Sequence, residues 1–124
     1  MIYLSPIKNN ERIKQLFENN NIPYDEFSGC VSATDKGEEL GFSLYSLDNE
    51  KIIVHCIEPL NDIPLADGIL RSTLHVAAEH SVMNAFYADS LDESFLEKID
   101  FIKDIEEKRL DIDKLFKSCC SCNG

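Results

Sequence analysis

The sequence predicts a mixed α/β fold in the order strand, helix, three-strand meander, helix, strand, helix and closing strand or hairpin. The main observation is an apolar run at 51–58 that leads into an amphipathic helical stretch at 62–77, after which a second apolar run follows at 82–87. Two strands joined through a helix usually lie parallel, with a right-handed crossover. The length of 124 residues suits one core, so we expect one domain.

The N-terminal part predicts a strand followed by a helix. Residues 2–4 are apolar, and apolar residues then recur at helical spacing over 13–17. Asn9 or Asn10 can cap this helix, because an asparagine side chain accepts hydrogen bonds from the first free amides. Pro23 lies beyond its expected end.

The next two strands are predicted to form a hairpin. The β-like runs at 30–34 and 40–45 flank residues 35–38, whose composition is typical of a turn. The apolar residues that alternate from Leu40 to Leu44 should share one face of the second strand.

The run at 51–58 has apolar residues pointing both ways, as expected for a central strand covered on both faces. Its neighbours His55 and Cys56 should therefore point to opposite faces. The helix after it must begin near Asp62, because Pro64 fits only a first helical turn.

The C-terminal part predicts a short helix at 91–99 and a hairpin of 101–105 with 109–112. We expect a single domain over 1–117 and a flexible, cysteine-rich tail over 118–124.

Charge and hydropathy exclude several classes of protein. A net charge of −11 disfavours binding to nucleic acid or anionic lipid. No run of about eighteen apolar residues predicts a membrane span, and the first residues lack the pattern of a secretion signal, so we expect a cytoplasmic protein. Five cysteines in that compartment do not predict a disulfide framework.

Three stretches, 51–58, 61–78 and 82–101, resemble the fourth strand, the pyrophosphate-binding loop and helix, and the fifth strand with its helix in the GNAT acetyltransferase family. Residues 94–101, Ser-Phe-Leu-Glu-Lys-Ile-Asp-Phe, resemble the family signature Phe-Tyr-Glu-Lys-Leu-Gly-Phe. The resemblance implies an acyl-CoA N-acyltransferase fold, in which two neighbouring parallel strands splay apart to admit pantetheine. It also implies acetyl-CoA or another acyl-CoA as donor, and a small-molecule or peptide amine as acceptor.

The resemblance places the donor against six residues at the start of the 62–77 helix: Asn61, Pro64, Leu65, Ala66, Asp67 and Gly68. The family has an Arg or Gln and two small residues, usually glycines, where this chain has Asn61, Pro64 and Ala66. Pro64 has no N–H to offer a phosphate, and Asp62 and Asp67 add negative charge there. Both departures weaken anion binding.

The resemblance also implies the catalytic candidates. Glu58 matches a place where many members carry the general base, which takes the proton of the acceptor amine. The tyrosine that often acts as the general acid in the family, by protonating the leaving thiolate, aligns with Leu96, which cannot donate a proton. Tyr87 is the substitute acid if its hydroxyl faces the same cleft.

The tail carries the remaining candidate site. Cys119, Cys120 and Cys122 have the thiolate-rich character that soft metals prefer, although they lack the Cys-x-x-Cys spacing of common zinc sites. The first hypothesis is acyl transfer from an acyl-CoA to an amine, with catalysis intact, weakened or lost, and the alternative is a non-catalytic binding or regulatory protein. In the second case the tail binds metal or takes part in thiol redox chemistry, or an exposed sheet edge contacts a partner protein.

Overall fold

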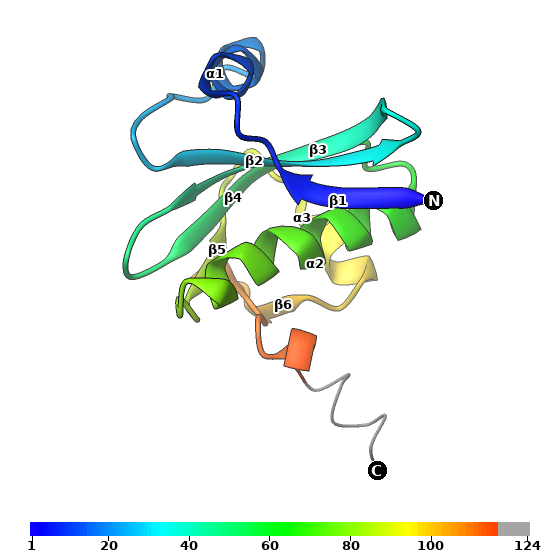
Figure 1. The fold of residues 1–124 in the computed structure, drawn as a ribbon. Coiled ribbons are helices and arrows are strands. Elements are labelled where there is room, and N and C mark those ends of the chain that lie inside the picture. Colours follow the sequence, from blue (N-terminus) through cyan, green and yellow to red (C-terminus); the bar gives the residue numbers. More distant parts are fainter. Residues whose placement is uncertain (117–124) are drawn as a thin grey trace.

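A seven-stranded mixed sheet forms the framework of the computed structural model, which describes residues 1–116 (Figure 1). Its strands lie in the order β1-β2-β3-β4-β5-β7-β6, and only β4 and β5 are parallel neighbours. The strands are β1 Ile2–Pro6, β2 Ser28–Asp35, β3 Glu38–Leu47, β4 Ile52–Glu58, β5 Ala85–Tyr87, β6 Ile102–Asp104 and β7 Arg109–Leu110. The helices of the described part are α1 Asn10–Asn19, α2 Ile63–Glu79 and α3 Glu93–Lys98. The predicted order and the mixed α/β class are confirmed.

Helix α1 begins where the sequence predicts. The Asn9 side chain accepts hydrogen bonds from the amides of Glu11 and Arg12, at 3.0 and 3.3 Å. One stripe of the helix is buried against the sheet through Ile13, Leu16 and Phe17.

The turn between β2 and β3 also agrees with the prediction. Lys36 and Gly37 have φ values of 53° and 83°, as expected for the tight turn that matches the twist of a hairpin. Further along β3, Leu40 is an extra residue, because Gly41 pairs with Ala33 and Glu39 pairs with Thr34. This β-bulge turns Leu40 toward α2, so the prediction that Leu40 shares a face with Leu44 is wrong.

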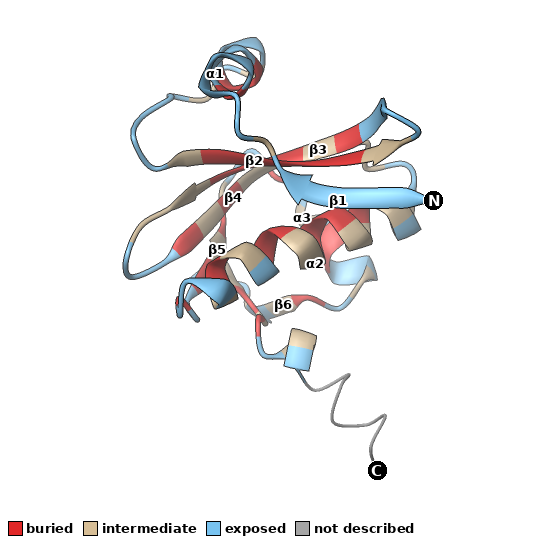
Figure 2. Cartoon of the chain, in the orientation of Figure 1, coloured by how far each residue is buried: buried red, intermediate tan, exposed pale blue. Residues whose placement is uncertain are grey.

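Strand β4 is the middle strand and is covered on both faces, as predicted (Figure 1). Helix α1 covers one face, where a small cluster of buried side chains includes Phe17, Cys30 and Leu44. Helices α2 and α3 pack in a larger buried cluster on the other face. The stripe of buried residues along α2 faces the sheet in Figure 2.

Helix α2 starts at the predicted place and is fixed to the sheet by buried hydroxyls. Asp62 is its N-cap and Pro64 lies in its first turn. Ser43 on β3 and Thr73 on α2 are fully buried, with their hydroxyl oxygens 2.6 Å apart. Thr73 donates to the Ile69 carbonyl at 2.7 Å, so Ser43 is the donor to Thr73.

Strand β5 covers only the last residues of the predicted 82–87 run. The preceding residues close the C-terminus of α2. Ser81 has a φ of 63°, and the amide of Val82 donates to the carbonyl of Ala77 at 2.9 Å. These are features of a Schellman motif, which uses the start of the apolar run as a helix cap.

The C-terminal hairpin is formed by β6 and β7, which are shorter than predicted. The described residues end in a helical turn after Asp113. None of the helices in residues 1–116 is long and apolar enough to cross a membrane.

Candidate functional site

The parallel strands β4 and β5 separate before β4 ends. Their last pair is Val54 with Tyr87, and the amide of Ala88 then donates to the Val54 carbonyl at 2.9 Å. Strand β4 continues to Glu58, but among the described residues no further pair joins β4 and β5. The Ser90 hydroxyl spans this gap by donating to the His55 carbonyl at 2.6 Å.

A second β-bulge lies at this divergence. His55 is the extra residue, since Leu44 pairs with Cys56 and Tyr45 pairs with Val54. The bulge turns both His55 and Cys56 toward α1. The imidazole Nε2 lies 2.8 Å from the Ser46 hydroxyl and the ring lies 6.3 Å from Phe17, while Cys56 packs against the same cluster as Phe17. The prediction that they point to opposite faces is therefore wrong.

His55 and Cys56 nevertheless do not form an activated nucleophile and base. Burial lowers the pKa of His55 below 6.5, so its imidazole is mostly neutral at neutral pH. Burial, with a smaller effect of the Glu58 charge, raises the pKa of the Cys56 thiol to about 11. A thiol with that pKa is protonated near neutral pH and is a poor nucleophile.

Glu58 ends β4 with an exposed side chain, opposite Phe42 on the α1 side of the sheet. The chain turns directly afterwards through a cis peptide bond to Pro59. This turn crosses closely over Gly41, where a Cβ atom would collide with the Glu58 carbonyl oxygen and lie 2.9 Å from Pro59 Cδ. Gly41 therefore positions the residues after the candidate base. A single glycine inside an apolar strand often marks a close approach of another backbone segment, and this was the sequence feature that could have indicated the role of Gly41.

Tyr87 lies on the other face of the sheet. Its side chain is 2% exposed and belongs to the cluster under α2 and α3. The hydroxyl donates to the Glu93 carboxylate at 2.8 Å. Burial and this hydrogen bond raise the pKa of Tyr87 to about 12. The structure thus places Tyr87 and Glu58 on opposite faces and does not bring them together.

Two amides in the first turn of α2, those of Leu65 and Ala66, are used within the helix. The Asp62 carboxylate accepts a hydrogen bond from the Leu65 amide at 3.3 Å, and the Ala66 amide donates to the Asp62 carbonyl at 2.9 Å. Pro64 has no N–H, and Asp67 accepts from Arg71 at 3.2 Å in the expected surface pair. The donors and positive charge that a pyrophosphate needs are scarce here.

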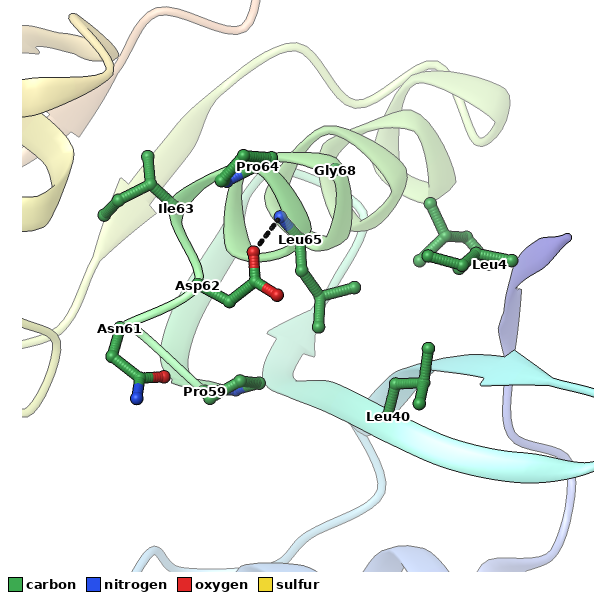
Figure 3. Close-up of a pocket in the computed structure, with 10 residues that line it drawn as sticks. Leu4, Leu40, Pro59, Asn61, Asp62, Ile63, Pro64, Leu65 and Gly68 are labelled. Atoms are coloured by element: carbon green, nitrogen blue, oxygen red, sulfur yellow. Dashed lines mark hydrogen bonds between the residues drawn. The ribbon is translucent and has the colours of Figure 1, made fainter.

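Four of the predicted donor-binding residues line one hollow of about 990 Å³: Asn61, Pro64, Leu65 and Gly68. Figure 3 shows the start of α2 on one side of this hollow and Leu4 and Leu40 on the other. Ala66 is fully buried, and neither Ala66 nor Asp67 lines the hollow. Asp62 is the only charged residue of the lining. A hollow that is apolar apart from an amide and a carboxylate does not fit a pyrophosphate.

The tail cysteines Cys119, Cys120 and Cys122 lie outside the described residues. Within residues 1–116, no group of three or more His, Cys, Asp or Glu side chains is arranged to hold a metal ion. Cys30 and Cys56 are free thiols.

The comparison with known proteins identifies the fold. No protein-family model and no curated protein matches the sequence. A GNAT family acetyltransferase from Elizabethkingia anophelis with acetyl-CoA bound superposes with a TM-score of 0.57 and 12% identity, over 79% of this chain and 71% of that chain. A GNAT family acetyltransferase from Streptococcus pneumoniae gives a TM-score of 0.51 and 14% identity, over 81% and 84%. The chain therefore has the fold of the GNAT acetyltransferases, as the sequence predicts. At this identity the similarity defines the fold and not the activity.

Proposed function

We propose that this GNAT-fold chain is a binding protein that has lost tight binding of acyl-CoA and does not transfer acyl groups efficiently. The observation that carries the proposal is the hydrogen bond that the Asp62 carboxylate accepts from the amide of Leu65. This amide lies at the helix start where the fold family binds pyrophosphate. A phosphate at this amide would have to displace the cap, which costs about 1 kcal/mol. It would also stand near a like charge, which costs roughly 1 to 4 kcal/mol at 4 Å near a surface.

The positions of the candidate acids support the same proposal. Leu96, which aligns with the family's Tyr, is fully buried and carries no proton to give. To act as an acid on the Glu58 side, Tyr87 would have to leave Glu93 and the buried cluster that holds it.

Acyl-CoA-dependent N-acyl transfer is the second candidate function. It is favoured by the divergence of β4 and β5 and by the exposed carboxylate of Glu58 at the end of β4. In this function Glu58 would take a proton from the acceptor amine, directly or through one water molecule.

Thermal unfolding with acetyl-CoA and with free CoA separates the two candidates. A ligand at a hundred times its dissociation constant adds about 2.7 kcal/mol, which is about 10 °C for a chain of this size. We expect no such shift at millimolar ligand. A shift of that size, together with amine acetylation that Glu58→Gln abolishes, would contradict the proposal and establish acyl transfer.

The tail is a separate part of the proposal, in which Cys119, Cys120 and Cys122 bind a soft metal ion. Three thiols within four residues support it, because thiolates are preferred ligands of such ions. Metal content should be measured on the full chain and on a chain ending at Ser118. Metal in the full chain alone is expected, and equal amounts in both would remove the tail as the site.

A further inference from the structure

The hollow beside α2 is built from segments far apart in the sequence. Its walls are the α2-facing side chains of β1, the bulged residue Leu40 of β3, and the segment from Pro59 into α2 (Figure 3). Gly68 leaves room on the helix, since a Cβ there would meet only Leu4 Cδ1, at 3.7 Å. A volume of about 990 Å³ is at the upper end of the range for small-molecule sites.

The hollow leaves apolar side chains in contact with water. Ile2 is 49% exposed, Leu40 is 37% exposed and Leu4 is 36% exposed. Covering apolar surface releases about 25 cal/mol per Å², so an apolar ligand gains affinity by lying across them. This wall therefore selects a ligand with an apolar body.

The polar end of the hollow selects the charge of the ligand. Asn61 and Asp62 are its only polar side chains, and no basic residue lines it. One oxygen of Asp62 accepts the Leu65 amide, and the other has no hydrogen-bond donor among residues 1–116. In Figure 3 this second oxygen lies beside the Leu65 side chain, across the hollow from Leu4 and Leu40. A carboxylate in that position attracts a cation and repels an anion.

We propose that the hollow binds an organic ammonium ion with an apolar body, its charged nitrogen at Asp62 and its apolar part against Leu4 and Leu40. The inference rests on the proposed function, in that the start of α2 is not occupied by the pyrophosphate of a donor. It adds the class of ligand that this binding protein takes.

The test is a titration of the full chain, followed by amide NMR signals, with three probes of similar shape. They are 2-phenylethylammonium, the neutral 2-phenylethanol and the anionic 3-phenylpropanoate. We expect the ammonium ion to bind most tightly and to shift the signals of residues lining the hollow, including Leu4 and Leu40. Binding of the anion as tightly as the ammonium ion, or shifts confined to other surfaces, would overturn the proposal.

Three variants separate charge from shape. Asp62→Asn keeps a good N-cap but removes the charge, and should weaken ammonium binding about fivefold, as for an exposed ion pair worth about 1 kcal/mol. Asp67→Asn is the matched control, because Asp67 lies on the same helix, just beyond its first turn, but outside the hollow. It should leave the affinity unchanged. Gly68→Met should fill the hollow and abolish binding of all three probes, while the spectrum of the remaining protein is preserved.

Equal loss of affinity in Asp62→Asn and Asp67→Asn would contradict the assignment of the charged nitrogen to Asp62. Changes in the lining signals with protein concentration alone would show a second copy of the chain on this surface and would also overturn it. Acetyl-CoA in the same titration distinguishes the two proposals. If neither acetyl-CoA nor the ammonium ion binds, only the present inference fails; if acetyl-CoA binds tightly, the proposed function fails, whether or not the ammonium ion also binds.

Discussion

Replacing Thr73 by valine tests how the structure holds α2 against the sheet. Thr73→Val keeps the shape of the side chain but leaves the Ser43 hydroxyl, fully buried and 2.6 Å away, without its acceptor. An unsatisfied buried donor costs about 1 to 3 kcal/mol, and we expect about 2 kcal/mol. Ser43→Ala should cost less, about 1 kcal/mol, because Thr73 still donates to the Ile69 carbonyl.

The double variant Ser43→Ala/Thr73→Val replaces both partners by apolar groups and should cost clearly less than the sum of the single changes. We expect a coupling energy of about 1 kcal/mol, measured from urea unfolding of the wild type and the three variants at equal m-values. Strictly additive losses, or a neutral Thr73→Val, would refute the assignment of Ser43 as the donor to Thr73.

Two further predictions concern Gly41 and His55. Gly41→Ala should destabilise the protein by about 1 to 3 kcal/mol, since its Cβ would collide with the Glu58 carbonyl oxygen. Gly68→Ala should instead stabilise it by about 0.5 to 1 kcal/mol, because a Cβ there has room on the helix. Similar urea midpoints for the two variants would contradict this. Burial lowers the pKa of His55 below the ordinary 6.5, so the unfolded chain binds its proton more readily. The contribution of His55 to stability should therefore be full above pH 6.5 and be lost as the pH falls toward the folded pKa. Between about pH 7.5 and about pH 5.5, the free energy of unfolding should fall less in His55→Gln than in the wild type. Equal decreases in the two proteins would exclude this effect.

Local sequence signals predicted the elements correctly where one residue type decides the backbone. Asn9 and Asp62 cap α1 and α2 as expected, and Pro64 fixes the start of α2 to within one turn. The parallel arrangement of β4 and β5 followed from the crossover through a helix, which the chain can hardly make in another way.

The β-bulges at Leu40 and His55 could not be predicted, because a regular two-residue period contains no sign of an inserted residue. The predictions that Leu40 shares a face with Leu44 and that His55 and Cys56 point to opposite faces were therefore wrong, although the strands themselves were correctly predicted. Both bulges lie at the candidate site, where they place Leu40 in the hollow and turn His55 toward α1.

The hollow itself depends on the meeting of β1, β3 and α2, which only the tertiary structure defines. The sequence indicated a weak anion site from Pro64 and Asp62, but not that Leu4 and Leu40 would stand opposite them. It also could not place the Tyr87 hydroxyl, which depends on Glu93 of α3 as its acceptor.

The affinity of acetyl-CoA for Asp62→Ser, measured by calorimetry beside the wild type, tests the central claim most directly. Serine keeps the N-cap but removes the charge at the helix start, so binding should appear or strengthen at least tenfold, which corresponds to about 1.4 kcal/mol. Asp92→Ser is the control, because Asp92 caps α3 in the same way without lining the hollow. Tight binding to the wild type that neither substitution changes would contradict the account.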